Sequence, residues 1–277
     1  MRIMFMGTAA AEGYPALFCV CDRCKKAREL GGRNFRSRSQ ALIDGRILID
    51  FNHDALYHSK LCDIDYTYIK SLLITHRHED HFSPYELNYR NRGAANLDEG
   101  VEKLQIYGPS DIKPPLERFI RDDNNYGFDV NTVEPFEPFD VEGYTVTVLK
   151  AVHGGGALIP YIYLIEKDGK ALLYAHDTGI LPNETFDYLK DNNKRLDFVS
   201  LDCTEGTKKI QYLGHMNLER NIIVRDRLIE NGSADSKTIF CLNHFSHNGE
   251  NTLYDDMCAV AEKHGFIVSY DGMTVDF

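Results

Sequence analysis

The chain has 277 residues, a formal net charge of −11 at pH 7, and 43% hydrophobic residues. This length and composition predict a folded protein with a substantial core and exclude a disordered chain. The acidic balance argues against a nucleic-acid-binding surface, which needs clustered Lys and Arg to neutralise phosphates. No apolar run approaches the ~18 residues of a membrane span, and the N-terminus lacks the apolar region of a signal peptide. A soluble cytoplasmic protein is therefore expected.

The first predicted elements flank a group of cysteines. Residues 2–6 are expected to form a strand, and residues 25–30 a short helix that ends at two glycines. Between them lie Cys19, Cys21 and Cys24. The chain has seven cysteines, an odd number, and the other four are scattered, which favours reduced thiols over a disulfide framework. Three thiolates at this spacing are typical of three corners of a tetrahedral zinc site. The alternative is three idle thiols.

Residues 39–50 carry the pattern of a β-hairpin with an Asp-Gly turn, and residues 161–175 repeat it. An aspartate follows each hairpin, Asp50 after the first and Asp177 after the second. The repetition predicts two similar halves that face each other. Asp50 is expected to fix a loop beside the functional site. Asp177 is expected to belong to the functional site itself.

The most informative stretch is residues 75–81, which follow the apolar strand 72–74 and precede a helix start at Ser83-Pro84. It contains three imidazoles and one carboxylate, on His76, His78, Asp80 and His81. Imidazole nitrogens and carboxylate oxygens suit zinc, iron or manganese. In a tight loop the first two histidines can face one ion while the other two residues face a second. A histidine-rich surface loop is the alternative, but it does not explain the position directly after a buried strand.

The pattern His76-x-His78-x-Asp80-His81 resembles the signature of the metallo-β-lactamase superfamily. The resemblance implies an α/β fold of one particular kind, a four-layered αβ/βα sandwich with a metal centre at one edge. It also implies that residues 1–277 form one domain of this fold.

Further candidate ligands follow other predicted strands. His153 ends an alternating strand and precedes three glycines, which leave space beside it. His244 and His247 follow a third apolar strand; His244 fits as the last ligand of the paired site, and His247 as the fourth corner of the cysteine cluster. His215 lies at a junction between a loop and a helix capped by Asn217, where it is either a solvated or a catalytic histidine.

The remaining pattern predicts several more elements and three histidines outside the metal centre. The expected helices are residues 54–61, 84–90, 114–121 and 250–263. The expected loop is 122–138, and the expected final hairpin is 266–277. The histidines expected on the surface, in the core or behind the metal ligands are His53, His58 and His176.

The whole chain is also similar to a narrower family within that superfamily, the phosphoribosyl 1,2-cyclic phosphate phosphodiesterases of phosphonate breakdown. The cysteine group, Asp177-Thr178, His244-x-x-His247 and Tyr270 to Met273 carry this resemblance. It implies one ion held by His76, His78 and His153, and a second held by Asp80, His81 and His244, with Asp177 between them. It also implies a structural zinc held by Cys19, Cys21, Cys24 and His247, and an active-site position for His215.

The resemblance implies a dinuclear metal-dependent hydrolase, a phosphodiesterase acting on a small cyclic phosphodiester such as phosphoribosyl 1,2-cyclic phosphate. Two divalent ions (Zn, Mn or Fe) would lower the pKa of a shared water. Asp80 and His215 are the expected catalytic residues, with His215 as general acid. The alternatives are a lactonase or other hydrolase of this fold, a tRNA 3′-processing nuclease, and a non-catalytic metal sensor. The expected partner is a small-molecule phosphodiester, with no nucleic acid or membrane, and a homodimer stays an open expectation.

Overall fold

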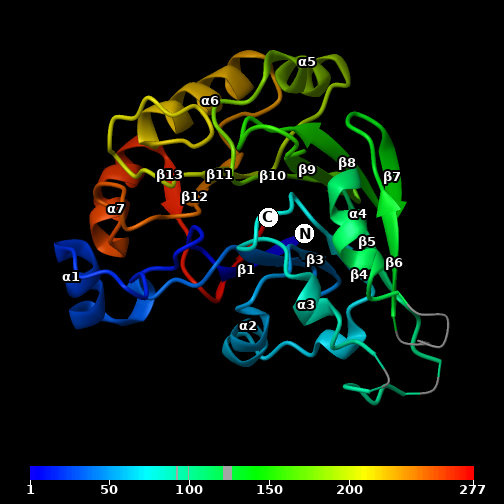
Figure 1. The fold of residues 1–277 in the computed structure, drawn as a ribbon. Coiled ribbons are helices and arrows are strands. Elements are labelled where there is room, and N and C mark those ends of the chain that lie inside the picture. The colour runs from blue at the N-terminus through cyan, green and yellow to red at the C-terminus, as the bar shows by residue number, and fades with distance from the viewer. Residues whose placement is uncertain (92, 99, 121–126) are drawn as a thin grey trace.

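The structure, a computed structural model, describes residues 1–91, 93–98, 100–120 and 127–277. Within them two seven-stranded β-sheets pack against each other, and helices cover the outer face of each sheet (Figure 1). Helices α5 and α6 lie outside one sheet, and α2 and α3 lie outside the other. The predicted four-layered α/β sandwich is confirmed.

The strands and helices have the following bounds. In spatial order the first sheet contains β14 (Met273–Asp276), β1 (Arg2–Gly7), β2 (Gln40–Ile43), β3 (Ile47–Ile49), β4 (Ser71–Leu73), β5 (Leu104–Gly108) and β6 (Phe128–Thr132). The second contains β13 (Phe266–Val268), β12 (Ile239–Asn243), β11 (Phe198–Asp202), β10 (Lys170–Ala175), β9 (Tyr161–Lys167), β8 (Tyr144–Lys150) and β7 (Pro138–Val141). The α-helices are α1 (Asp22–Leu30), α2 (Ala55–Leu61), α3 (Pro84–Leu87), α4 (Lys113–Glu117), α5 (Asn183–Asp191), α6 (Leu218–Glu230) and α7 (Tyr254–Ala261). Short 3-10 turns are η1 (Gly32–Asn34), η2 (Tyr66–Tyr68), η3 (Ser110–Ile112) and η4 (Glu262–His264).

Both sheets follow the same plan, as the repeated hairpin predicted. In the first, β14, β1, β2 and β3 pair antiparallel, and β3, β4, β5 and β6 continue in parallel. In the second, β7 to β10 pair antiparallel and β10 to β13 pair in parallel. The Asp-Gly turns have positive φ at both positions, 49° and 70° at Asp44 and Gly45, and 50° and 76° at Asp168 and Gly169. Such φ values are those of the type I′ turns that favour tight hairpins.

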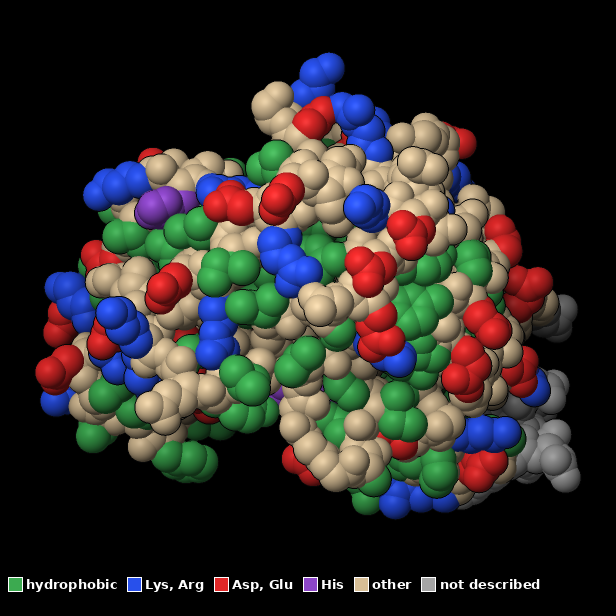
Figure 2. All heavy atoms as spheres, turned by 90° about the horizontal axis from the view of Figure 1, so that it is seen from above, with side chains coloured by type: hydrophobic (Ala, Val, Ile, Leu, Met, Phe, Trp, Pro, Cys, Tyr) green, Lys and Arg blue, Asp and Glu red, His purple; other side chains and the backbone are tan. Residues whose placement is uncertain are grey.

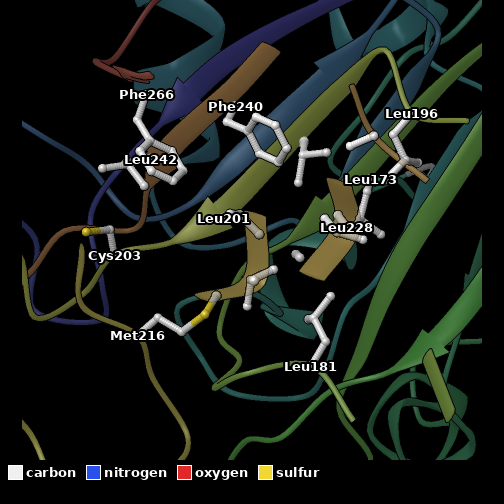
Figure 3. Close-up of a cluster of buried hydrophobic side chains, with 14 of the residues drawn as sticks. Leu173, Leu181, Leu196, Leu201, Cys203, Met216, Leu228, Phe240, Leu242 and Phe266 are labelled. Carbon is white, nitrogen blue, oxygen red and sulfur yellow. The ribbon is translucent and has the colours of Figure 1, made fainter. Parts of the chain in front are cut away.

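Apolar side chains fill three layers. One cluster lies between the sheets and includes Phe5, Ile49 and Tyr174. A second lies between the second sheet and its helices, where Leu173 and Leu201 of the sheet pack near Leu228 of α6 (Figure 3). A third covers the outer face of the first sheet. The central parallel strands are therefore buried on both faces, which explains why they read as continuous apolar runs.

This topology sends the carboxyl ends of several strands to one edge of the sandwich. Strands β3 and β4 end there in the first sheet, and β10, β11 and β12 end there in the second. Strand β8 runs parallel to β10, because both pair antiparallel with β9. Loops at the carboxyl ends of parallel strands are the common location of binding sites in open α/β sheets.

The prediction of a final hairpin is wrong. Strand β13 pairs in parallel with β12 in the second sheet, whereas β14 pairs antiparallel with β1 in the first. Residues 269–272 thus cross from one sheet to the other. Asp271 holds this crossover by accepting hydrogen bonds from Thr8 Oγ1 and from Ser37 Oγ, both at 2.6 Å. The Asp-Gly signature identified the turn, but local turn chemistry does not specify which strands pair.

The prediction of a loop at 122–138 is wrong over part of its length. Residues 122–126 lie outside the described residues, but Phe128–Thr132 forms β6, which pairs in parallel with β5. The asparagine-rich flank concealed the alternating pattern of this edge strand. The predicted helix 114–121 is shorter, Lys113–Glu117, and its residue 121 also lies outside the described part.

No helix among the described residues has the length and apolar character needed to cross a membrane. On the face seen from above, on the side of α5 and α6, Lys and Arg side chains are interspersed with Asp and Glu (Figure 2). That face carries no broad basic stripe of the kind that follows a nucleic-acid backbone.

Candidate metal centre

The strand-end loops bring seven predicted ligands together. In each of two groups, all ligand atoms lie within 4.8 Å of one another. The first group comprises His76, His78, His153 and Asp177. The second comprises Asp80, His81, Asp177 and His244. Asp177 therefore belongs to both groups, in the division that the resemblance implied.

The first group has the spacing of a metal site. His78 Nδ1 lies 3.0 Å from His76 Nε2 and 3.1 Å from His153 Nε2. Asp177 Oδ2 lies 3.2 Å from His76 Nε2 and 3.5 Å from His153 Nε2. Tetrahedral ligands ~2.1 Å from a zinc ion would stand roughly 3.4 Å apart, so these atoms fit a cation between them. Burial lowers the pKa of His76 to about 3, which keeps its imidazole in the neutral form that binds metals.

The second group has similar spacing around His81. Its Nε2 lies 3.3 Å from Asp80 Oδ2, 3.0 Å from Asp177 Oδ2 and 3.3 Å from His244 Nε2. His244 Nε2 is 3.7 Å from Asp177 Oδ1. All four residues are buried. Two carboxylates and two imidazoles in this arrangement form a second set of nitrogen and oxygen donors for a divalent cation.

Asp177 provides the strongest test of whether a cation fits. Its side chain is only 3% exposed, and its Oδ1 accepts no hydrogen bond, although His215 Nδ1 lies 3.2 Å away. Burial alone would raise the pKa of this carboxyl, but contacts with His244, His76 and His81 hold it well below its usual range. A buried anionic oxygen without a donor is costly unless a cation compensates it. The residues present therefore fit divalent cations.

Asp177 and His244 also share an unusual backbone conformation. Their φ angles are 51° and 63°, in the left-handed region that non-glycine residues seldom adopt. Asp50, which follows β3, has φ 63°. Strained residues of this kind cluster at functional sites, where the surrounding structure fixes them.

Asp50 fixes the loop beside the site, as predicted. It is fully buried, and its Oδ1 accepts hydrogen bonds from the backbone N–H and the hydroxyl of Thr75 at 2.8 and 2.9 Å. Its Oδ2 lies 2.7 Å from His81 Nδ1, so the other ring nitrogen, Nε2, faces the centre. A carboxylate behind a histidine in this way fixes the tautomer and orientation of a metal-binding imidazole.

Asp202 does the same in the second half, and the sequence did not identify it. It is fully buried at the end of β11. Its Oδ1 accepts from Met216 N at 2.9 Å, and its Oδ2 lies 3.1 Å from His215 Nδ1 and 3.5 Å from His244 Nδ1. One signal was available in the sequence. Asp202 ends an apolar strand of the second half, just as Asp50 follows an apolar strand of the first half and supports a ligand there.

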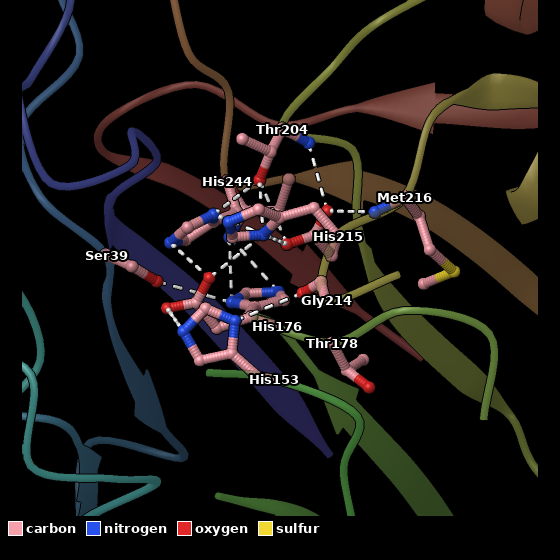
Figure 4. Close-up of polar contacts among 12 residues, drawn as sticks. Ser39, His153, His176, Thr178, Thr204, Gly214, His215, Met216 and His244 are labelled. Carbon is pink, nitrogen blue, oxygen red and sulfur yellow. Dashed lines mark hydrogen bonds and ion pairs between the residues drawn. The ribbon is translucent and has the colours of Figure 1, made fainter. Parts of the chain in front are cut away.

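His215 lies at the centre, consistent with the catalytic alternative of its prediction. Figure 4 shows it beside His153 and His244. Although burial lowers the pKa of His215, the carboxylates of Asp202 and Asp177 raise it to about 9. Its described polar contacts all use Nδ1, which leaves Nε2 for a ligand. His215 also forms a third group within 4.8 Å, together with Asp177, Asp202 and His244.

The three histidines that were predicted to lie outside the metal centre are not members of these groups. His53 is on the surface, 45% exposed, 3.8 Å from Glu86. His58 is buried, with Nδ1 2.7 Å from Gln40 Oε1. His176 packs in the core against Tyr174, next to the centre but turned away from it.

The four predicted zinc ligands also come together. Cys19, Cys21, Cys24 and His247 have ligand atoms within 4.8 Å of one another. His247 Nδ1 lies 3.4 Å from Cys19 Sγ and 3.7 Å from Cys21 Sγ. A zinc ion with Zn–S bonds of ~2.3 Å would place its sulfurs roughly 3.8 Å apart, so the geometry fits. Cys21 caps the N-terminus of α1, where its Sγ accepts from Cys24 N at 3.4 Å.

Two thiols of this cluster have pKa values that are shifted in opposite directions. Burial opposes ionisation of Cys21, but hydrogen bonds from Cys24 N–H and His247 lower its pKa to about 6. Burial and the neighbouring thiols raise the pKa of Cys24 to about 12. Three thiolates at this distance need a cation among them.

A pocket of about 330 Å³ opens beside the His/Asp centre. Its lining includes ligands from both groups and His215. Glu12, Glu205, Ser246 and Asn248 also line it. The centre is therefore accessible to a small molecule, and the pocket volume is in the range of small-ligand sites.

Comparison with known proteins agrees with this geometry. The family model described as a beta-lactamase superfamily domain matches residues 46–230. A comparison with curated proteins found no match. Among solved structures, the chain is similar to a new diphosphatase from the PhnP family, with 18% identity, a TM-score of 0.75, and coverage of 100% of this chain and 97% of the other.

Two further structures are similar over their whole length. Zn²⁺-bound PqqB from Methylobacterium extorquens has 18% identity and a TM-score of 0.75, with 100% of each chain covered. The short form of human tRNase Z has 16% identity and a TM-score of 0.65, with 100% of this chain and 99% of the other covered. At these identities the likeness is one of fold.

Proposed function

Because the chain belongs to the beta-lactamase superfamily, we propose that it is a dinuclear metal-dependent hydrolase that cleaves a small phosphodiester. The observation that carries the proposal is Asp177, a buried carboxylate shared by both ligand groups, with an oxygen that accepts no hydrogen bond. A bridging carboxylate is the feature that holds two cations at one reaction site. Zinc, manganese and iron all suit the donor set.

The proposed reaction adds water across one ester bond. The water oxygen attacks phosphorus, the bond to the leaving oxygen breaks, and that oxygen takes up a proton. When bound, the cations supply activation of water and neutralisation of charge on the phosphoryl oxygens. For a cyclic phosphodiester, the product is one molecule that carries a phosphomonoester and a new hydroxyl.

The chain's own residues position the reactants and deliver the proton. Asp80 and Asp177 face the pocket beside the ligand histidines. His215 also lines it, and Asp202 orients the His215 ring through Nδ1 at 3.1 Å. His215 Nε2 is then the group that donates a proton to the leaving oxygen, a step worth typically ~10²–10⁴-fold in rate.

Two observations support phosphorus over a carbonyl carbon as the reacting atom, and a third favours a small substrate. The resemblance to cyclic phosphate phosphodiesterases covers ligands and zinc cluster alike. A diphosphatase and a tRNase are among the proteins of similar fold. The net charge of −11 and a pocket of about 330 Å³ favour a small substrate over a nucleic acid. A small cyclic phosphodiester of a sugar is the class that we propose.

A paired assay tests this proposal. A ribose 1,2-cyclic phosphate, with and without a 5-phosphate, and an acyl lactone are incubated with equal concentrations of metal-loaded enzyme. We expect hydrolysis of a cyclic phosphodiester that stops after chelation and returns on adding zinc or manganese. Faster turnover of the lactone would assign a lactonase instead. Phosphodiester turnover that survives complete metal removal would contradict the proposal.

A further inference from the structure

The part of the pocket wall that does not belong to the metal-ligand groups is acidic. Glu12 and Glu205 both line the pocket, and among its described lining residues there is no Lys or Arg. A site that must bind a second phosphate normally supplies a guanidinium or ammonium for it. The pocket instead presents carboxylates where the non-reacting part of a substrate would lie.

Glu12 is held rigidly in this wall. Its Oε1 accepts hydrogen bonds from Ser246 Oγ at 2.6 Å and Asn248 Nδ2 at 3.0 Å, and it lies 3.4 Å from His247 Nε2. His247 is also a member of the thiolate cluster, so that cluster helps to fix the Glu12 carboxylate. All three contacts use Oε1, which leaves Oε2 as an acceptor for a ligand.

Glu205 adds a second fixed charge. Its side chain is 16% exposed, and its buried Oε2 accepts no hydrogen bond. Lys208 Nζ lies 3.4 Å from this oxygen and donates instead to the backbone oxygen of Asn248 at 3.1 Å. The ammonium is thus shared between Glu205 and this backbone oxygen, so the carboxylate is only partly compensated.

Two arginines adjacent to pocket-lining residues are engaged with other groups. Arg38 pairs with Asp54 at 3.0 Å and donates to the Ala11 carbonyl. Arg77, next to the ligand histidines in sequence, pairs with Asp111 at 3.0 Å. Recruiting either one for a substrate phosphate would mean breaking an existing ion pair.

The negative charges of the carboxylates in and behind the pocket would outnumber the positive charges of two divalent cations. Two divalent cations would face six carboxylates, on Glu12, Asp50, Asp80, Asp177, Asp202 and Glu205. A monoanionic phosphodiester directly at the cations is favourable. A second phosphate at this acidic part of the wall would meet Glu12 and Glu205 at close range, where like charges in a partly buried site repel strongly.

Resting on the proposed function, we propose that the substrate carries its only negative charge on the reacting phosphodiester, and that its remainder is uncharged and bears hydroxyls. Those hydroxyls donate hydrogen bonds to Glu12 and Glu205. The proposed substrate class is therefore a cyclic phosphate of an otherwise unphosphorylated sugar. This narrows the expectation from sequence, because phosphoribosyl 1,2-cyclic phosphate has a further phosphate at its 5-position.

A matched pair of substrates tests the inference. Ribose 1,2-cyclic phosphate and its 5-phosphorylated counterpart present the same scissile bond and differ only in the second phosphate. We expect kcat/KM to be higher for the unphosphorylated sugar by a factor on the order of ten or more. The preference should shrink at high ionic strength, because salt screens a repulsion between partly exposed charges.

Two variants test whether the acidic part of the pocket wall causes the preference for the unphosphorylated sugar. E12Q and E205Q keep the shape of the side chain and remove its charge, so each should lower the ratio of the two kcat/KM values by several-fold. E230Q, at the exposed end of α6, is the matched control and should leave the ratio unchanged.

The outcomes separate the inference from the function on which it rests. Equal rates for the two sugars, or a preference for the phosphorylated one, overturn the inference while the phosphodiesterase assignment stands. Hydrolysis of neither sugar by enzyme with its metals bound overturns the proposed function itself. If either variant fails to fold, the wild-type ratio and its salt dependence still decide the inference.

Discussion

The two candidate metal sites of this protein differ in donors, support and access. The His/Asp centre uses imidazoles and carboxylates from loops at the ends of buried strands, and it opens into a pocket. The cluster of Cys19, Cys21, Cys24 and His247 uses thiolates from a short loop and the first turn of α1. One site has an open side for a substrate, whereas the other already has four protein ligands, the arrangement of structural zinc.

The two sites also differ in what holds them together. The His/Asp centre rests on two sheets and on buried carboxylates, so its loops are positioned by the core. The loop with the cysteines rests on a much smaller apolar cluster, around Tyr14 and Ala16, and its Leu17 and Val20 are 75% exposed and its Phe18 100% exposed. A bound cation is therefore expected to contribute folding free energy mainly at the cysteine cluster and reactivity mainly at the other centre.

The largest effect is expected from removing the charge that both halves of the His/Asp centre share. In Asp177→Asn the amide cannot replace a carboxylate between two cations, so kcat/KM should fall by ~10⁴-fold or more and the centre should lose metal. Zinc at the cysteine cluster should remain. Asp191→Asn, an exposed change on α5, is the control. An active Asp177→Asn enzyme with normal metal content would contradict the shared role.

Replacing His215 separates proton delivery from metal binding. His215→Gln should lower kcat by about 10²-fold while metal content stays unchanged, because the side chain delivers a proton to the leaving oxygen. The loss should be smaller for a substrate whose leaving group needs no proton, such as a p-nitrophenyl ester. Loss of metal in this variant would make His215 a ligand, in the group it forms with Asp202 and His244.

Replacing a carboxylate that supports a ligand histidine should lower activity less than replacing a ligand. Asp50→Asn weakens the anchor of His81 and should cost roughly 10–100-fold in metal affinity or activity. Asp202→Asn should cost a similar amount and should also lower kcat through His215. Metal titration of both variants against wild type measures the effect. An Asp202→Asn enzyme with wild-type kcat and metal affinity would show that Asp202 does not support His215 or His244.

Disrupting the cysteine cluster should lower stability more than it lowers activity. Cys24→Ser should lose one equivalent of zinc and lower Tm by roughly 5–10 °C, with less than about a tenfold change in kcat/KM. Cys62→Ser, outside the cluster, is the control for thiol loss. A Cys24→Ser protein with full zinc content and wild-type Tm would show that these thiols are idle, the alternative left open by the sequence.

The smallest effect concerns the pH dependence of the free energy of unfolding. Burial lowers the pKa of His58 to about 4, so the folded protein holds it neutral where the unfolded chain binds a proton. Stability from this group is complete above about pH 6.5 and is lost as pH falls towards 4, by on the order of 2–3 kcal/mol. His58→Gln should flatten the dependence of the unfolding free energy on pH over that window. An unchanged slope would contradict this assignment.

The sequence predicted the parts of the structure that are written in local patterns. The loop from His76 to His81, the Asp-Gly hairpins and the cysteine spacing each combine a chemical signature with a strand or helix boundary. The repeated hairpins even predicted the two equivalent halves, since β3 and β10 occupy equivalent places in their sheets.

The features that the sequence did not reveal depend on contacts between distant segments. Asp202 looks like the polar end of an apolar strand until the fold places it behind His215 and His244. The partners of β13 and β14 belong to different sheets, which no turn signature specifies. Glu12 is one acidic residue among many in the sequence. Only the structure brings it to the pocket wall and within 3.4 Å of His247.

The most direct test is a crystal structure of the metal-loaded protein with its ions identified by anomalous scattering. The account predicts two ions in the His/Asp centre, roughly 3.5–4 Å apart, each bonded to one oxygen of Asp177. It also predicts one zinc among the three cysteines and His247. An Asp177 carboxylate that contacts no ion, in a protein whose other sites are filled, would contradict the central claim.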